Sequence, residues 1–431
     1  MSINKDKIEK LLKEGKHFCV LPWIHFHAWP NKNVLPCCIA DSSSPVSKTP
    51  SGDETILDMM NSEQYKEVRL AMLEDAPLDI CKRCYDVEEL GTWTMRQSHN
   101  TRRGEEYLDY IAETTNEDGS LNEFKMAYMD IRFSNLCNMK CRSCGPDCSS
   151  QWAQEYSSLC NNNKDELWDK HRIDKIIINN NDDNTFLPKL KEHLKDVQEV
   201  YFAGGEIIIQ PEHYECLDYW IDNNLNEQVE LTYTTNFSTL QYKKDSNLIG
   251  YWKKFPKLQI WASLDGGGKH AEVIRKGTDW DKIINNIKMV KQEVPHAKFQ
   301  ITPTISIWNV FQFPDFFDEL VDQQLIDINE DSAPRINLLT YPWWANLQIL
   351  PQKTRYKLAE RYKISRERYK NNVHIANGFK MLVYALYEGK ENLDGIKQFM
   401  RENNRVDEVR SERLLDVIPQ LEEVYKWAQE N

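Results

Sequence analysis

Three cysteines that stand close together carry the clearest chemistry in the chain. Cys137, Cys141 and Cys144 have the spacing C-x3-C-x2-C. A [4Fe-4S] cluster normally takes four Cys thiolates, so a loop that offers three holds three irons and leaves the fourth open to a small molecule. The alternatives are a zinc loop or unrelated thiols, but structural zinc sites usually pair one C-x2-4-C with a distant second pair of ligands. The spacing therefore favours a cluster with one open iron.

The residues before this loop indicate how it is positioned. Residues 127–133 alternate between apolar and polar side chains, as a strand does. The cysteine loop is then expected at the carboxyl end of this strand, which is the end where barrel enzymes carry their active sites.

Strand-like and helix-like segments alternate between residues 125 and 345. Further strands are predicted at 199–203, 229–235, 258–265, 299–305 and 335–339, which indicates βα units with a parallel sheet. Pro303 indicates a bulge in the fifth strand. Glycine or polar residues follow the strands, namely Gly204, Gly205, Glu206, Asn236, Ser263 with Asp265, and Asn309. Because the carboxyl ends of parallel strands face one pole of a barrel, we expect these residues to lie near the cysteine loop.

With this cysteine loop and these strand ends in order, the chain resembles the radical S-adenosylmethionine (radical SAM) superfamily. The resemblance implies an α/β fold with a partial, open-sided (β/α)6 TIM-like barrel. It implies that Cys137, Cys141 and Cys144 hold a [4Fe-4S] cluster whose open iron is chelated by the amine and carboxylate of SAM. An electron then splits the sulfonium, and the resulting 5'-deoxyadenosyl radical abstracts hydrogen from a substrate C–H position.

The resemblance also implies where SAM binds. The strand end Gly204, Gly205 and Glu206 matches the family's site for the SAM amino group, where backbone without side chains lets a ligand approach. Ser263 and Arg275 match the family positions that bind ribose or carboxylate, and a guanidinium suits a carboxylate well.

Two departures from the family pattern fall in this region. Ile207 stands where the family usually has Pro, which would mainly stiffen the turn. Asn236 matches a family Thr-Asn-Gly, but Phe237 replaces the glycine, which leaves the role of Asn236 open.

A second group of thiols lies in the N-terminal region. Residues 24–28 and 34–40 predict a β-hairpin, with Cys19 before it and Cys37 at its far end, and Cys81 and Cys84 follow as a C-x2-C pair. This arrangement resembles the twitch domain, a short form of the SPASM domain, although in better-known family members that domain follows the barrel. The resemblance implies a second, auxiliary [4Fe-4S] cluster on Cys19, Cys37, Cys81 and Cys84.

Several alternatives stay open in this N-terminal region. Cys38 competes with Cys37, because adjacent strand residues point to opposite faces, and a structural zinc ion competes with the auxiliary cluster. His25 and His27 share one strand face, as a metal-binding pair would. Beside tryptophans, we expect the two histidines to pack or to form hydrogen bonds.

Composition narrows the class of protein. The chain has 431 residues, a net charge of -13 and eleven cysteines, and the negative charge argues against nucleic acid or an anionic membrane as the main partner. The N-terminus lacks an apolar run, and no stretch is long and apolar enough to span a bilayer. We therefore expect a cytoplasmic protein whose cysteines are ligands rather than disulfides.

The predicted organisation has three parts: an auxiliary-cluster region over 1–120, a radical SAM barrel over 121–345 and a helical extension over 346–431. By family analogy alone, the first-choice substrate is a peptide or protein side chain. A dehydrogenase or epimerase of a small molecule such as a sugar is the alternative, and a zinc-stabilised binding protein without catalysis is the rival from another class. The expected electron donor is a flavodoxin or ferredoxin.

Overall fold

The computed structural model of the protein describes residues 4–89, 93–161, 176–243, 247–329 and 334–431. By compactness the chain divides into two units. Unit 1 comprises Met1–Ser134, Ile178–Gly204 and Gln210–Leu231, and unit 2 comprises Asn135–Ile177, Gly205–Ile209 and Thr232–Asn431. The three-part organisation stays a prediction.

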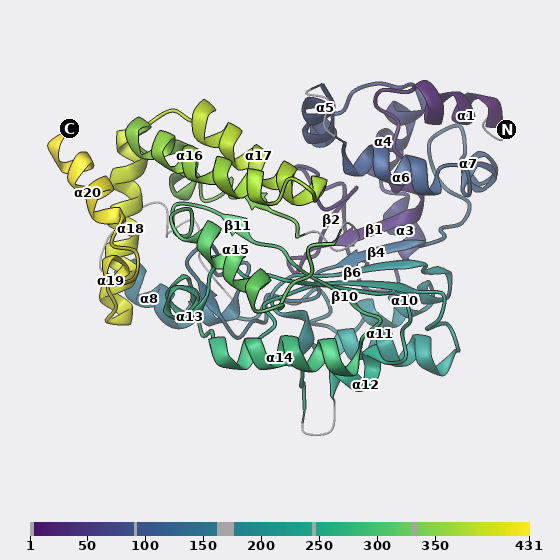
Figure 1. Cartoon of the computed structure of the whole chain (residues 1–431). Coiled ribbons are helices and arrows are strands. Elements are labelled where there is room, and N and C mark those ends of the chain that lie inside the picture. The colour runs from purple at the N-terminus through teal and green to yellow at the C-terminus, as the bar shows by residue number, and fades with distance from the viewer. Residues whose placement is uncertain (1–3, 90–92, 162–175, 244–246, 330–333) are drawn as a thin grey trace. The chain divides into compact units, whose positions relative to one another are not determined.

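One mixed, largely parallel sheet has eight strands in the order β10-β8-β7-β6-β4-β1-β2-β3 (Figure 1). The strands are β1 (His25–Ala28), β2 (Asn33–Leu35), β3 (Ser47–Lys48), β4 (Tyr128–Ile131), β6 (Glu199–Phe202), β7 (Glu230–Thr235), β8 (Leu258–Ala262) and β10 (Lys298–Ile301). Five of the six predicted barrel strands lie in this one sheet, in chain order from β4 to β10. The predicted α/β class with a partial TIM-like barrel is confirmed.

The N-terminal hairpin continues this sheet. β1 pairs antiparallel with β2, with Ala28 opposite Val34, and on its other edge it pairs in parallel with β4. The predicted hairpin is thus present, but its second strand ends at Leu35 rather than at residue 40, so Cys37 and Cys38 lie in the turn that follows. The proline at position 36 has no N–H to continue a ladder.

The sixth predicted barrel strand lies outside the large sheet. The segment predicted over 299–305 is interrupted after Ile301 and resumes as β11 (Thr304–Ile305), which pairs in parallel with β12 (Asn337–Leu338). The interruption falls at Pro303, where the sequence predicted a bulge.

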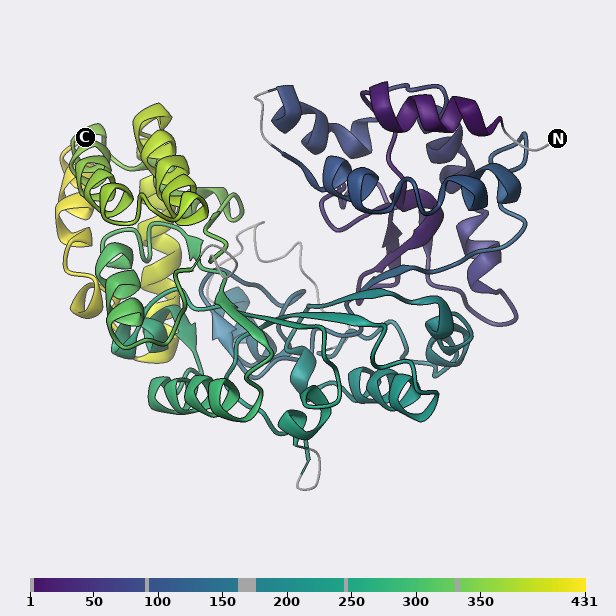
Figure 2. The ribbon, with the colours of Figure 1, turned by 45° about the vertical axis from the view of Figure 1, so that its right-hand side comes forward.

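Helices precede, connect and follow the strands. Those of unit 1 are α1 (Lys5–Glu14), α2 (Leu21–Ile24), α3 (Ile56–Met60), α4 (Glu63–Leu73), α5 (Lys82–Glu89), α6 (Met95–Arg103), α7 (Leu108–Thr114), α10 (Phe186–Lys191) and α11 (Pro211–Asp222). Those of unit 2 are α8 (Ala153–Asn161), α12 (Leu248–Trp252), α13 (Gly268–Ile274), α14 (Trp280–Glu293), α15 (Phe313–Asp322), α16 (Gln352–Arg368), α17 (Val373–Glu388), α18 (Leu393–Arg410), α19 (Leu414–Val417) and α20 (Leu421–Glu430). Figure 2 shows α16 and α17 running side by side, in the helical C-terminal part that the sequence predicted.

Local sequence explains where several helices begin. Thr55 and Asp58 form a capping box at the start of α3, and the Ser62 side chain caps the start of α4. Asp279 caps α14 in the same way, by accepting a hydrogen bond from the N–H of Lys282. Each cap satisfies a backbone donor that the helix itself leaves unpaired.

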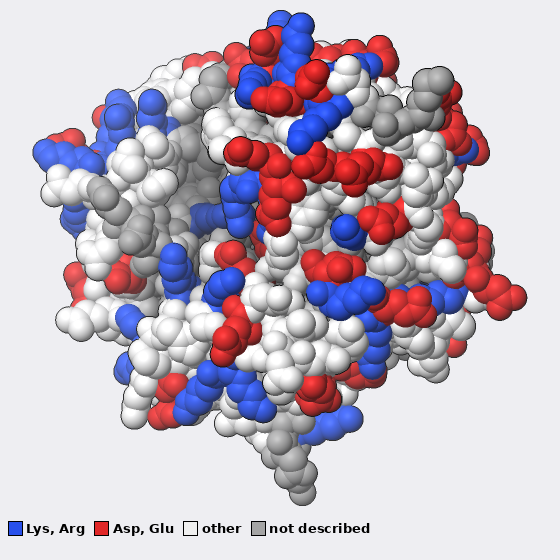
Figure 3. All heavy atoms as spheres, turned by 90° about the vertical axis from the view of Figure 1, so that its right-hand side faces the viewer, with Lys and Arg blue, Asp and Glu red and all other residues white. Residues whose placement is uncertain are grey.

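Among the described residues, no helix is long and apolar enough to cross a membrane. Acidic and basic side chains are intermixed over the face shown in Figure 3.

Candidate active site

The cysteine loop of unit 2 is held by a short strand pair. β5 (Lys140–Cys141) pairs antiparallel with β9 (Arg275–Lys276), which places Cys141 directly opposite Arg275. The Arg275 Nη1 lies 3.9 Å from the Cys141 Sγ. One of the predicted SAM-binding residues therefore lies against the middle thiol of the loop, although the two are far apart in the sequence.

The three thiols of the loop interact electrostatically. Burial raises the pKa of Cys137 to about 12. A hydrogen bond from the Cys144 thiol, assisted by the nearby Arg275 cation, lowers the pKa of Cys141 below its ordinary value, and the same bond raises the pKa of Cys144. Because the thiolate is the form that binds metal, Cys141 is the member of the trio that is best prepared to bind iron.

Glu206 is buried and joins two strand ends. Its Oε1 accepts a hydrogen bond from the Thr235 hydroxyl at 2.7 Å, and its Oε2 accepts one from the Asn236 N–H at 2.7 Å. Burial raises the pKa of the Glu206 carboxyl, and its own N–H donates to the Leu136 carbonyl next to the cysteine loop. Glu206 thus connects the end of β7 with Leu136, the residue before the cysteine loop.

Asn236 continues this connection into the cysteine loop. Its side-chain Nδ2 donates to Asn138 Oδ1 at 2.8 Å, and Asn138 Nδ2 donates to Ser238 Oγ at 2.8 Å. Asn138 lies between Cys137 and Met139, so the end of β7 fixes the first turn of the cysteine loop. The sequence singled out Asn236 but not its partners Asn138 and Ser238.

Arg275 is held in place by Asp265. The Asp265 Oδ2 lies 2.8 Å from Arg275 Nε and 2.7 Å from Nη2, and Asp265 Oδ1 accepts from the N–H of Thr304. Burial opposes the charged form of Arg275, but Asp265 and the neighbouring thiols hold its pKa above the ordinary value. Asp265, predicted at a strand end, and Arg275, predicted from the family resemblance to bind SAM, therefore act as a pair beside Cys141.

The two glycines and Ser263 have backbone roles in this structure. Gly204 and Gly205 both have positive φ, at 88° and 49°. A Cβ on Gly204 would meet the Arg132 Cβ at 2.6 Å, so the turn after β6 requires glycine there. Ser263 follows β8, and its N–H donates to the Thr235 carbonyl at 2.8 Å.

Helix α18 also binds the cysteine loop, a contact that no sequence pattern indicated. Arg142, next to Cys141, donates to Asn403 Oδ1 at 3.0 Å and forms an ion pair with Asp407. Arg410 donates to the Lys140 carbonyl at 2.9 Å. These contacts join residues more than 260 positions apart in the sequence, so no local pattern could have signalled them.

A cavity of about 250 Å³ adjoins the loop in unit 2. Its lining includes Cys144, Cys148 and the aromatic side chains of Trp308, Trp343 and Trp344. Aromatic walls with a few polar groups are typical of ligand pockets, and this cavity opens beside a predicted iron ligand.

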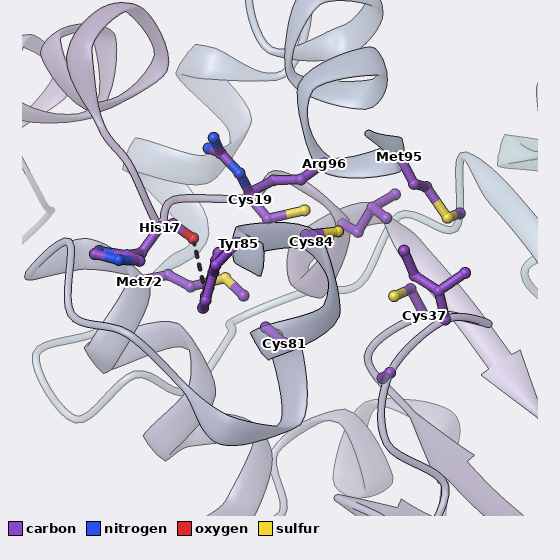
Figure 4. A pocket seen from close by; sticks show the side chains of 12 residues that line it. His17, Cys19, Cys37, Met72, Cys81, Cys84, Tyr85, Met95 and Arg96 are labelled. Carbon is purple, nitrogen blue, oxygen red and sulfur yellow. Dashed lines mark hydrogen bonds between the residues drawn. The ribbon is translucent and has the colours of Figure 1, made fainter. Parts of the chain in front are cut away.

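The N-terminal thiols converge on one pocket in unit 1. Cys19, Cys37, Cys81 and Cys84 all line it, and Figure 4 shows them around a common space. Burial raises the pKa of all four thiols, to about 11 for Cys81. Four thiols that resist ionisation when alone become good ligands once a metal cation compensates their charge.

The structure separates the two candidates Cys37 and Cys38. Cys37 lines the thiol pocket. The Cys38 thiol instead interacts with the Asp130 carboxylate and lies 3.8 Å from Met95 Sδ. The structure thus places Cys37, not Cys38, with the other three thiols. Cys216, on α11, is a buried single thiol.

Comparison with known proteins gives distant structural likenesses. No protein-family model and no curated protein matches the chain. Among solved structures, native anSMEcpe with bound AdoMet aligns with a TM-score of 0.37 and 15% identity, over 57% of this chain and 61% of that one. Streptococcus suis SuiB aligns at 0.30 and 13%, over 61% and 53%, and TYW1 with a lysine-pyruvate adduct at 0.27 and 15%, over 56% and 71%. The chain thus spans about three fifths of the first of these proteins, and likenesses this distant do not establish what it binds or does.

Proposed function

We propose that this chain is a radical SAM enzyme whose catalytic cluster is bound by Cys137, Cys141 and Cys144. The observation that carries the proposal is the convergence of the strand ends on one cysteine loop. Asn236 reaches the loop through Asn138, and Arg275 reaches it through Cys141. A structural zinc loop has no need of a buried cation and an amide network around three thiols.

The donor set fits the cluster. Three thiols from one loop lie close enough to shift one another's pKa, and the pKa of Cys141 is lowered by Cys144 and Arg275. When bound, a [4Fe-4S] cluster there would supply the electron that cleaves SAM reductively and so generates the hydrogen-abstracting 5'-deoxyadenosyl radical.

The residues around the loop have separate tasks in this proposal. Arg275, fixed by Asp265, keeps a positive charge beside Cys141 and is placed to meet the carboxylate of SAM. Both carboxylate oxygens of Glu206 already accept hydrogen bonds. The Gly204 carbonyl likewise already accepts a hydrogen bond, from Gln210 Nε2. We therefore assign the SAM ammonium to the backbone carbonyl of Gly205, and we assign Glu206 the positioning of that turn.

We also propose that Cys19, Cys37, Cys81 and Cys84 bind an auxiliary [4Fe-4S] cluster. The support is that all four thiols line one pocket within unit 1. Zinc is the competing occupant, and metal content separates the two. The chain with both clusters contains about eight irons, from two cubes of four.

The proposed substrate is a peptide or protein side chain. Its support here is the aromatic cavity beside Cys144, whose walls suit an apolar or aromatic side chain. The structure of anSMEcpe with a Cp18Cys peptide describes that protein's ligand and not this one's. We propose a flavodoxin or ferredoxin as the electron donor.

The decisive experiment is anaerobic SAM cleavage by the full chain. Protein purified under nitrogen is reduced with dithionite and given SAM, and 5'-deoxyadenosine is measured by chromatography. We expect the wild-type chain to form it and Cys141→Ala to fall to the level without protein. Cys216→Ala, which removes a buried thiol outside both groups, is the matched control. Cleavage by Cys141→Ala equal to the wild-type rate would show that the cluster assignment is wrong.

The Cys81→Ala variant distinguishes the roles of the two thiol groups. We expect this variant to contain about half of the iron, because one cube is lost, and to retain part of its SAM cleavage. Colourless wild-type protein with stoichiometric zinc and no iron would overturn both assignments.

A further inference from the structure

Three buried side chains in unit 1 offer metal ligands that neither thiol group uses. They are His25 and His27 on β1 and Asp130 on β4, and each is fully buried, with 0% exposure. Each offers one donor atom, and these atoms lie within 4.8 Å of one another. From the sequence, the two histidines are expected to pack or to form hydrogen bonds, and no pattern points to Asp130.

Sheet geometry explains why the three side chains meet. Side chains two apart along a strand share a face, so His25 and His27 lie on the same side of β1. The parallel register places His25 beside Tyr128 and His27 beside Asp130, on that same face. The site is therefore formed by the backbone pairing of the two strands.

The hydrogen bonds of the two imidazoles fix which nitrogens are free. His25 Nδ1 lies 3.0 Å from the Tyr128 carbonyl oxygen, and His27 Nδ1 lies 2.9 Å from that of Asp130. A carbonyl only accepts, so each Nδ1 carries the proton and each Nε2 presents its lone pair. This is the arrangement that prepares a histidine to bind metal through Nε2.

The two imidazole lone pairs of the site accept no hydrogen bond within the described residues, because neither Nε2 has a partner there. The Asp130 carboxylate interacts electrostatically with His27, Arg132 and the Cys38 thiol, but neither of its oxygens accepts a hydrogen bond of normal geometry. The His27 Nδ1 is 3.1 Å from Asp130 Oδ2, but its single proton is already directed at the carbonyl. Fully buried acceptors are normally satisfied, and a bound cation satisfies the two Nε2 atoms.

We propose that His25, His27 and Asp130 bind one Zn²⁺ ion. Two imidazoles with one carboxylate suit zinc and leave a coordination position open.

Zinc binding by the full chain tests this site without using SAM cleavage. Anaerobically purified protein is dialysed against Zn²⁺ and desalted, and zinc and iron are measured by mass spectrometry. We expect His27→Gln and Asp130→Asn each to bind about one zinc fewer than the wild type, with iron unchanged. His99→Gln, at another buried histidine beside Tyr128, is the matched control and should retain the wild-type zinc content. Equal zinc in all four proteins would overturn the proposal.

X-ray absorption at the zinc edge of the wild-type protein covers the case in which the variants do not fold. The proposed site predicts nitrogen and oxygen scatterers in the first shell, whereas zinc held by the thiol groups shows sulfur alone. A sulfur-only shell, or no bound zinc, would refute the His–His–Asp site whatever the outcome for SAM chemistry.

Discussion

At the scale of single residues, the ion pair between Asp265 and Arg275 decides the charge beside the cysteine loop. Asp265 is 4% exposed and receives two guanidinium nitrogens on one oxygen. Arg275 in turn approaches Cys141. A buried pair of this kind is valuable mainly because each charge is expensive to bury without the other.

Asp265→Asn tests this pairing. The substitution keeps the shape but leaves the Arg275 cation uncompensated, so we expect the free energy of unfolding to fall by about 3 kcal/mol. Urea unfolding followed by circular dichroism measures the change. The double variant Asp265→Asn/Arg275→Met should recover part of the loss, because no buried charge remains. The pairing would be contradicted if the double variant lost as much free energy of unfolding as the two single variants together.

The sequence predicted many of these residues and missed their partners. The thiols, Arg275 and Asn236 could be found because they fall in a recognisable motif or at strand ends. Asn138 and Arg142 stand inside the cysteine motif, but their partners are supplied by distant segments. A motif predicts which residue stands at a position, whereas its long-range hydrogen bonds can be known only from the folded structure.

At the scale of elements, the turn after β6 depends on its first glycine. Gly204 adopts a φ of 88° and packs against the Arg132 side chain. We expect Gly204→Ala to lower the free energy of unfolding by about 2 kcal/mol, because the backbone is strained and the new methyl group collides with Arg132.

Gly250→Ala is the matched control for this substitution. A Cβ on Gly250, within α12, meets no atom within 4 Å, so alanine there should raise stability by about 0.5 kcal/mol. Urea midpoints of the two variants, measured in parallel, test the contrast. Equal effects at the two positions would contradict a role for the turn geometry.

Helix α11 contributes a pH dependence through His213. Burial lowers the pKa of His213 to about 3, whereas an unfolded histidine has a pKa near 6.5. The unfolded chain therefore binds the extra proton, and stability falls as the pH drops below about 6.5. The loss from this residue reaches about 2 kcal/mol at pH 5. Urea unfolding of His213→Leu should show a shallower decrease between pH 7.5 and pH 5, and an unchanged slope would contradict this account.

The strands could be predicted better than their pairing. Alternation located β4, β6, β7, β8 and β10 within a few residues. It could not show that β1 joins the edge of β4, because strand alternation shows which face is buried but not which strand is the neighbour. Nor could it show that β11 and β12 leave the main sheet.

At the scale of the whole molecule, the C-terminal helices hold the cysteine loop in place, although the two are distant in sequence. The Arg142 guanidinium is almost fully buried and forms ion pairs with Asp407 and Glu412. Arg410 pairs with Glu155, which also receives Lys140. The sequence predicted a helical extension here, and its ion pairs show a more specific role in holding the cysteine loop.

Asp407→Asn tests the support given by α18. We expect the free energy of unfolding to fall by about 2 kcal/mol, because a buried guanidinium loses its charged acceptor. Iron should also be released faster to a chelator, since the loop next to Cys141 loosens. Glu423→Gln, in an exposed pair with Lys353, should change stability by less than about 0.5 kcal/mol. Identical chelation rates for the two variants would contradict the link between helix and loop.

The pairing of β1 with β4 has a consequence for synthesis of the protein on the ribosome. All four thiols of the N-terminal pocket lie within the first 84 residues of the chain. Asp130, the third member of the proposed His–His–Asp site, is synthesised later, on the strand that pairs with β1. The two proposed metal sites of unit 1 therefore become complete in a fixed order as the chain grows.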